Sequence, residues 1–333
     1  MLIIFFIFGL TLDGASDGIH YYLTPDYNKL LEIDVWADAA IQIFYSLGVA
    51  CGTLTTLSSY NKFNNNCHRD ALLIGLINCG TSFFAGFGIF AILGFMAKQT
   101  GQEIEDVVQS GSALAFVVYP EAFLYMPIPQ IWSFLFFFML LTLGVGSMLA
   151  YGATLTTVII DQFGLTKKKH YVIIVTCFFM FLGGVTMCFE GGLYMFDLLD
   201  NVSLCWNIMV CAFLELIIVS WMYGVNNFFA DIQQMEIKIP KVLEYYWKAC
   251  WCIVSPALIL FLIIMKFIQY EPYQYGTYVY PDSIQALAWL IPSSSVVILP
   301  LMALYQIGYY RGKGFELIAL FRPSRHWGPQ VSK

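Results

Sequence analysis

The sequence carries little charge and lacks several patterns that would mark a soluble protein. Only 11% of its 333 residues are charged, whereas a soluble domain of this length carries about a quarter. The net charge of −6 is spread over the segments between apolar runs, and no basic stripe marks a partner such as nucleic acid. The nine cysteines form no Cys-x-x-Cys pair; most lie in apolar runs, as small hydrophobic residues do.

The histidines offer no chemistry either. His20, His68, His170 and His326 are expected in loops or in the tail, as solvated residues without partners. With no cluster of metal ligands or catalytic groups, we expect no enzyme and no bound cofactor.

Long apolar runs dominate what is present. The chain is 59% hydrophobic with a mean hydropathy of +0.71, and runs of about 20 residues are long enough to cross a bilayer. We therefore predict an all-α multi-pass membrane protein. The seven predicted spans lie at 36–60, 71–97, 130–160, 170–189, 203–229, 249–269 and 284–309.

The first ten residues, MLIIFFIFGL, are apolar but too short to span. We expect them to be the outer end of an earlier helix. A signal peptide is the alternative, although the segment has no basic n-region and no clear cleavage site.

The basic residues predict the orientation of these spans. Of the 16 lysines and arginines, 13 lie in the segments 60–70, 164–170 and 230–248 or in the tail from 308. Cytoplasmic loops are enriched in such residues, so these segments and the C-terminus are predicted to be cytoplasmic. Segments 11–35 and 98–129 are then extracellular, and a sequon at Asn201 falls in a short outer loop.

We expect one partial transmembrane domain over 1–333, with a long extracellular loop at 98–129 and a cytoplasmic tail at 310–333. Pro120, Pro127 and Pro129 argue against one continuous helix in the long loop.

The first predicted span contains small residues near its middle. Ser46-Leu47-Gly48-Val49-Ala50-Cys51-Gly52 is a candidate break, because glycine lowers helix propensity. A membrane helix breaks where its backbone faces protein or a wet cavity, as at transporter binding sites. The alternative is that these residues only permit close helix packing.

Two neighbouring spans each present an amide and a hydroxyl at the same spacing. Gln42 and Ser46 are four residues apart, as are Asn78 and Ser82, and each pair shares a helix face. The carbonyl of Asn78 suits a hard cation, and the donors of Gln42, Ser46 and Ser82 suit an anion. Hydrogen bonds between helices are the other interpretation.

Several long phrases resemble the sodium- and chloride-dependent neurotransmitter symporter family. In this chain they are GLTLDGASDGIHYYLTPDYNKL, SYNKFNNNCHRDALL, SGSALAFVVYPEA, SWMYGVNNFFADI and RPSRHWGP, in order from residue 9 to 329. The resemblance implies the inverted-repeat leucine-transporter fold. The seven spans would match helices six to twelve of twelve, and the first ten residues the end of helix five.

The resemblance also implies ion sites, with sodium and chloride as coupled substrates. The first sodium site would use Ser46 and Asn78, and the chloride site Gln42, Ser46 and Ser82 with a tyrosine from helix two. The second sodium site would fall on Leu143, Gly146 and Ser147. Many animal members have an aspartate at Gly146 and a glutamate at Ala153, so these departures put the coupling stoichiometry in doubt.

The break would contact substrate, and three side chains would stand at the gates. The substrate residues would be Leu47, Gly48, Val49, Cys51 and Gly52, within a phrase most like glycine- and proline-type carriers. Glu215 resembles an outer-gate acid, Asp161 an inner-gate acid, and Tyr60 a neighbour of the inner gate.

These features lead us to expect sodium- and chloride-coupled symport of a small amino acid or neurotransmitter across the plasma membrane. Much of the family's first repeat has no counterpart here, so we expect this chain to be part of a longer carrier and not to transport alone. The alternative is a non-transporting fragment that regulates a full-length relative, in a homo- or hetero-oligomer. A seven-span receptor or channel would need its own motifs.

Overall fold

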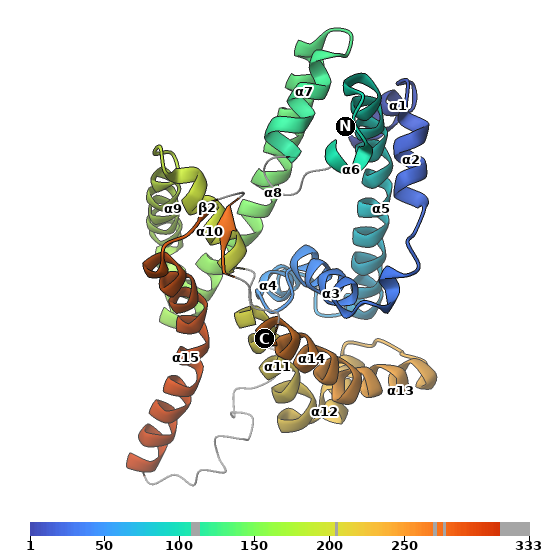
Figure 1. Cartoon of the computed structure of the whole chain (residues 1–333). Coiled ribbons are helices and arrows are strands. Elements are labelled where there is room, and N and C mark those ends of the chain that lie inside the picture. Colours follow the sequence, from blue (N-terminus) through green and yellow to red (C-terminus); the bar gives the residue numbers. More distant parts are fainter. Residues whose placement is uncertain (108–113, 204–205, 269–271, 276–277, 314–333) are drawn as a thin grey trace. The chain divides into compact units, whose positions relative to one another are not determined.

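The computed structural model describes residues 1–107, 114–203, 206–268, 272–275 and 278–313. Helices dominate, as predicted, and one two-stranded hairpin is added (Figure 1). The α-helices are α1 (Leu2–Leu10), α2 (Ala15–Leu23), α3 (Ile33–Leu47), α4 (Thr53–Ser59), α5 (Cys67–Thr100), α6 (Ile104–Val107), α7 (Tyr119–Leu124), α8 (Pro129–Phe163), α9 (Lys169–Thr186), α10 (Gly192–Ser203), α11 (Trp206–Ile217), α12 (Val225–Gln234), α13 (Lys241–Ala249), α14 (Ser255–Ile268) and α15 (Asp282–Gly312).

Shorter helical segments and the hairpin connect or interrupt these helices. Two 3₁₀ turns are η1 (Lys29–Leu31) and η3 (Thr166–Lys168), and three π segments are η2 (Leu114–Val118), η4 (Ile218–Gly224) and η5 (Cys250–Val254). The strands β1 (Gln274–Tyr275) and β2 (Tyr278–Val279) pair antiparallel.

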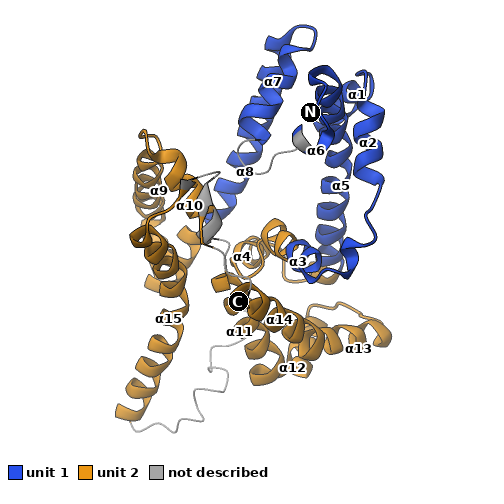
Figure 2. Ribbon diagram, in the orientation of Figure 1, with its two compact units in different colours: residues 1–40, 69–153 blue, residues 41–68, 154–333 orange. Residues whose placement is uncertain are grey.

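The chain forms two compact units, coloured separately in Figure 2. Unit 1 contains Met1–Ala40 and Arg69–Ala153, and unit 2 contains Ile41–His68 and Thr154–Lys333. The boundaries fall inside α3, α5 and α8, so each of these helices contributes residues to both units.

Within the described residues, six helical segments are long and apolar enough to cross a membrane. They confirm six of the seven predicted spans, and they are Cys67–Thr100, Pro129–Phe163, Thr166–Thr186, Trp206–Gln234, Lys241–Ile268 and Asp282–Gly312. The remaining predicted span, 36–60, is not one helix but two, separated at the candidate break. α3 has 15 residues and α4 has seven, and each half is shorter than the roughly 20 residues that a span needs.

In unit 1 the helices α1 and α2 form a pair bent by 113°. α1 has nine residues, which agrees with a segment too short to span. α2 packs closely against α5: a Cβ at Gly94 would lie 2.5 Å from the Gly14 carbonyl oxygen and from the Gly18 nitrogen. The predicted outer connection 11–35 thus contains a helix that lies alongside a span, and glycine permits the close approach.

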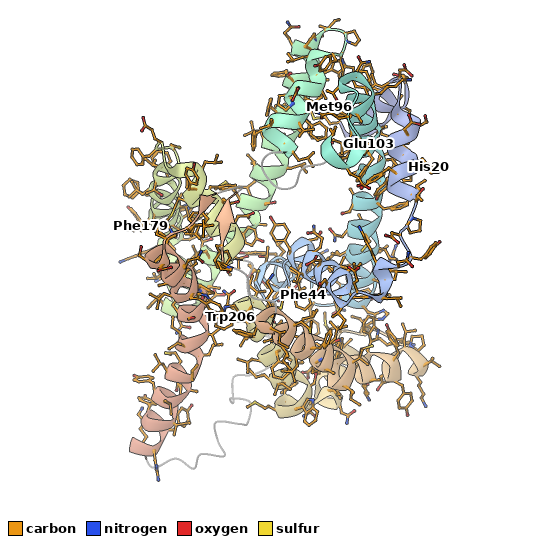
Figure 3. All side chains as sticks on the ribbon, viewed as in Figure 1. His20, Phe44, Met96, Glu103, Phe179 and Trp206 are labelled. Atoms are coloured by element: carbon orange, nitrogen blue, oxygen red, sulfur yellow. The ribbon has the colours of Figure 1, made fainter. Side chains whose placement is uncertain are left out.

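The core of unit 1 lies beneath the predicted long loop. α5 ends at Thr100, α7 contains Pro120 in its first turn, and α8 starts at Pro129, so the loop is not one continuous helix. Phe123 and Ala122 of α7 are fully buried against side chains of α1, α5 and α8. In Figure 3, Met96 marks the α5 side of this core.

In unit 2, two π segments face one another. The Ser220 hydroxyl of η4 donates to the Trp251 carbonyl of η5 at 3.2 Å, and Trp221 Nε1 donates to the Cys252 carbonyl at 3.2 Å. A π segment alters the helical hydrogen-bond pattern, and side chains from a neighbouring helix can satisfy the carbonyls. These bonds connect the fifth and sixth predicted spans.

The hairpin after α14 is attached to α10. Tyr280 is buried, and its hydroxyl donates to the Tyr194 carbonyl at 3.0 Å and to Asp197 Oδ2 at 3.3 Å. The Gln285 amide accepts from the Tyr273 N–H at 3.1 Å and donates to the Tyr273 carbonyl at 2.8 Å. These side-chain hydrogen bonds hold Tyr280 against α10 and Tyr273 against α15.

α9 is mostly exposed. Phe179 points away from the neighbouring helices in Figure 3 and is 66% exposed. An apolar face of this kind suits contact with lipid, in agreement with a membrane-spanning helix.

Candidate functional site

The first predicted span is broken where the sequence placed the break. α3 ends at Leu47 and α4 begins at Thr53, while Gly48, Ala50 and Gly52 have φ of 60°, 60° and 72°. These left-handed conformations cannot continue a right-handed helix. The interpretation of these residues as mere packing residues is therefore insufficient, although the break starts two residues later than Ser46.

The break is held by its own backbone. The Val49 N–H donates to the Phe44 carbonyl at 3.1 Å, and the Cys51 N–H donates to the Gly48 carbonyl at 3.2 Å. Val49 and Cys51 are half-buried, as are Leu47 and Gly48, whereas Gly52 is exposed. The five predicted substrate residues thus lie together at the junction of α3 and α4, the kind of junction at which transporters bind their ligands.

The amide–hydroxyl pairs lie on α3 and α5. Gln42 and Ser46 are exposed on α3, one turn apart in unit 2. On α5, Asn78 is half-buried and Ser82 exposed, also one turn apart in unit 1. Each pair has the predicted spacing within its unit. The first sodium site and the chloride site each combine residues of both units, so both sites stay predictions.

The second predicted sodium site lies on one turn of α8. The Ser147 hydroxyl donates to the Leu143 carbonyl at 3.4 Å, so two of the predicted ligand groups are adjacent. Leu143, Gly146 and Ser147 are all exposed. Within the described chain, a Cβ at Gly146 would meet nothing within 4 Å. Two neutral oxygens are suitable for sodium but supply no charge.

The three predicted gate residues differ in their contacts. Asp161 near the end of α8 and Glu215 on α11 are both exposed, and within the described residues neither forms an ion pair. Tyr60, directly after α4, is hydrogen-bonded through its hydroxyl to Thr157 Oγ1 of α8 at 2.7 Å. Sequence reasoning missed Thr157. The available signal was its position four residues before Asp161, on the same face of the helix.

The expectation that the histidines lack partners is wrong for two of them. His68 lies in the first turn of α5, and its Nε2 accepts a hydrogen bond from Trp247 Nε1 at 3.2 Å. His20 lies in α2, where its Nδ1 is 3.3 Å from Thr24 Oγ1. Tertiary packing of α13 near the start of α5 explains the first pairing. His170 is exposed on α9, and His326 lies outside the described residues, as do most of the 310–333 tail and the side chains of the sequon at Asn201.

The described residues contain no cluster of three or more His, Cys, Asp or Glu side chains able to hold a metal ion. The predicted ion ligands are instead uncharged side-chain and carbonyl oxygens on α3, α5 and α8. Six helices long and apolar enough to cross a membrane define the class of a multi-pass membrane protein. The interruption between α3 and α4 is of the kind found at transporter binding sites.

The comparisons with known proteins identify the family. The sequence model of the sodium:neurotransmitter symporter family matches residues 1–309, and the chain belongs to that family. Over its whole length it is 43% identical to the human sodium- and chloride-dependent neutral and basic amino acid transporter B(0+), of which it covers 53%.

Two further relatives carry glycine transporter names. The chain is 42% identical to the sodium- and chloride-dependent glycine transporter 1 of Xenopus laevis, covering 53% of it. It is 40% identical to glycine transporter 2 of the same species, covering 42%. In both cases all of this chain is aligned, so it spans about half the length of these relatives.

Proposed function

We propose that this protein takes part in sodium- and chloride-coupled symport of a small amino acid, with glycine or proline as the favoured class. The break at Gly48–Gly52 carries this proposal, because it places the ends of two short helices in the middle of an apolar segment, as at transporter binding sites. Membership of the symporter family supports coupling to sodium and chloride. The names of the relatives support an amino-acid substrate.

In this proposal the side chains have separate roles. Ser46 and Asn78 contribute oxygens to one sodium ion, while Gln42, Ser46 and Ser82 donate hydrogen bonds to chloride. Leu143 and Ser147 contribute a carbonyl and a hydroxyl to a second, weaker sodium site, because Gly146 has no carboxylate. Asp161 and Glu215 act at the two gates. The protein would lie in the plasma membrane with its C-terminus in the cytoplasm.

The first experiment is to size the native product. An antibody against FRPSRHWGPQVSK would be used on deglycosylated source membranes. A band near twice 37.8 kDa is expected if transport belongs to a longer product. The product found would then be tested for uptake of labelled glycine, with sodium replaced by choline and chloride by gluconate.

Variants separate the ion sites from general damage. Ser46→Ala and Asn78→Ala should abolish sodium-dependent uptake while the protein still reaches the membrane. Ser58→Ala is the matched control, because the Ser58 hydroxyl is exposed and donates only locally, to the Thr55 carbonyl at 2.8 Å. Uptake that is unchanged without sodium, or that survives both site substitutions, would reject the proposal.

The second candidate is a membrane protein that binds a longer relative without transporting. The observation in its favour is the exposed face of α8, where only 6% of the most apolar window is buried. Co-purification of the 37.8 kDa chain with a full-length symporter, together with reduced uptake by that symporter, would support this candidate. No association at matched expression would remove it.

A further inference from the structure

The short helix α4 begins with an apolar contact and a buried hydroxyl. A methyl group at Gly52 would stand 3.7 Å from Thr154 Cγ2, which is ordinary apolar contact. The Thr53 hydroxyl is buried and, among the described residues, has no hydrogen-bond partner. With seven residues, α4 is also too short to be stable by its own backbone hydrogen bonds. Its position therefore depends on contacts with the rest of the protein.

Such a contact occurs at the other end of α4. Tyr60 directly follows the helix, and its hydroxyl lies 2.7 Å from Thr157 Oγ1, on a helix 97 residues away in the sequence. The hydroxyls of Ser58 and Ser59 instead donate to carbonyls of their own helix, at 2.8 and 2.7 Å. The Tyr60 side chain is 62% exposed, so packing alone restrains it little. The hydrogen bond to Thr157 connects this end of α4 to α8.

The α8 side of this contact is also specific. Thr154 and Thr157 are three residues apart and share the helix face that meets α4. Ala153, one turn before Thr157, has a methyl side chain that cannot form a hydrogen bond. Thr157 is thus the position at which α8 offers Tyr60 a hydroxyl group, one turn before Asp161.

We propose that Thr157 is a positioning residue, which acts through Tyr60 to hold the inner half-helix α4 against α8 and so controls access to the break from that end. This inference rests on the proposed symport function for its purpose. The bond joins two neutral hydroxyl groups, and either can donate. Such a bond contributes modestly to stability and exchanges readily with water, which suits a contact that must form and open repeatedly.

The test uses the native thiol of Cys51, which lies in the break. Sealed vesicles of each orientation, containing the full chain, are treated with a membrane-impermeant maleimide, and labelling of the Cys51 peptide is followed by mass spectrometry. Thr157→Val keeps the shape and removes the hydroxyl. It should speed labelling about two- to ten-fold from the Tyr60 side of the membrane, the range expected for one lost hydrogen bond.

Conservative and control variants make the outcome specific. Thr157→Ser should restore the original rate, and Tyr60→Phe should match Thr157→Val without further increase in the double variant. Thr142→Val is the control on the same helix, because the Thr142 hydroxyl donates to Met139 of its own helix at 2.8 Å. Equal rates for the Val and Ser variants, or faster labelling from both sides, would overturn the proposal.

Because the labelling needs neither sodium nor substrate, its result does not depend on whether the protein is a symporter. If labelling follows the hydroxyl but the native product shows no sodium-dependent uptake, the attachment stands and symport is rejected. If uptake depends on sodium but labelling ignores Thr157, symport stands and the role of Thr157 is rejected.

Discussion

The segment 33–59 and helix α8 both contain several glycines, yet only the first is broken. Gly48 and Gly52 flank the gap between α3 and α4, while Gly144, Gly146 and Gly152 lie within a continuous helix of 35 residues. Each glycine costs a helix about 1 kcal/mol relative to alanine. By that measure α8 should be the weaker helix, so glycine content alone does not explain the break.

The difference lies in the backbone conformation of the residues between the glycines. Ala50 has a φ of 60°, which costs an L-residue about 1–2 kcal/mol. Such a conformation persists only where the surrounding structure enforces it. The break is therefore imposed by the surroundings and made cheaper by glycine, whereas the α8 glycines lie in a helix that is free to continue.

The largest effect is expected where a glycine allows two helices to approach closely. Gly94→Ala would place a Cβ 2.5 Å from the Gly14 carbonyl oxygen and should lower the free energy of unfolding by about 3 kcal/mol. The measurement is unfolding of the full chain in detergent micelles by SDS, followed by tryptophan fluorescence. Gly75→Ala on the same helix is the control, because in the described structure its Cβ would meet nothing within 4 Å. Equal losses in both variants would contradict the close approach.

The next effect tests the break directly. Gly52 has a φ of 72°, so Gly52→Ala should lower the free energy of unfolding by about 1–2 kcal/mol through backbone strain. A methyl group has room there, at 3.7 Å from Thr154, so steric overlap would not explain a loss. The same SDS titration applies, with Gly144→Ala in α8 as the comparison. A stabilised Gly52→Ala variant would mean that 48–52 can become helical.

Replacing alanine by glycine should change the free energy of unfolding in opposite directions in the break and in α8. Ala50→Gly relieves the strain of a positive φ and should raise the free energy of unfolding by about 1 kcal/mol. In α8, Ala153→Gly should lower it by about 0.5–1 kcal/mol, because glycine is unfavourable within a helix. SDS unfolding of the two variants side by side gives the comparison. Two losses of similar size would show that both sites behave as ordinary helix.

The smallest effect is expected at the second predicted sodium site. Gly146→Ala adds a methyl group where, in the described chain, nothing lies within 4 Å, and should stabilise α8 by about 0.5 kcal/mol. Helix content by circular dichroism and the SDS midpoint both measure this change. A marked loss instead would indicate that Gly146 is packed against another helix in the membrane.

Much of the architecture was predictable because apolar length and turn residues are local properties. Six spans, a short first helix and a break near residues 46–52 all follow from runs of residue types. The division of 36–60 into two helices was predictable only as a candidate, because small residues also serve helix packing. The helix α2 alongside α5 was not predicted, since the Gly94 contact is set by pairs distant in sequence.

The candidate site was predictable in part for the same reason. Spacing placed Gln42 with Ser46 and Asn78 with Ser82 on shared helix faces, and the resemblance assigned their roles. Thr157 and Trp247 were missed, because Thr157 lies 97 residues from Tyr60 and Trp247 lies 179 residues from His68. The spacing of Thr157 from Asp161 placed it on the same helix face, but no local pattern shows that Tyr60 meets it there.

The sequence by itself determined the class, the spans and the family, because hydropathy and ordered motifs are written along the chain. Only the tertiary structure decided which glycines bend the backbone, which permit contact and which side chain holds α4 to α8. The physical reason is that strain, close approach and hydrogen bonding depend on which distant atoms come together, and a linear pattern does not contain those distances.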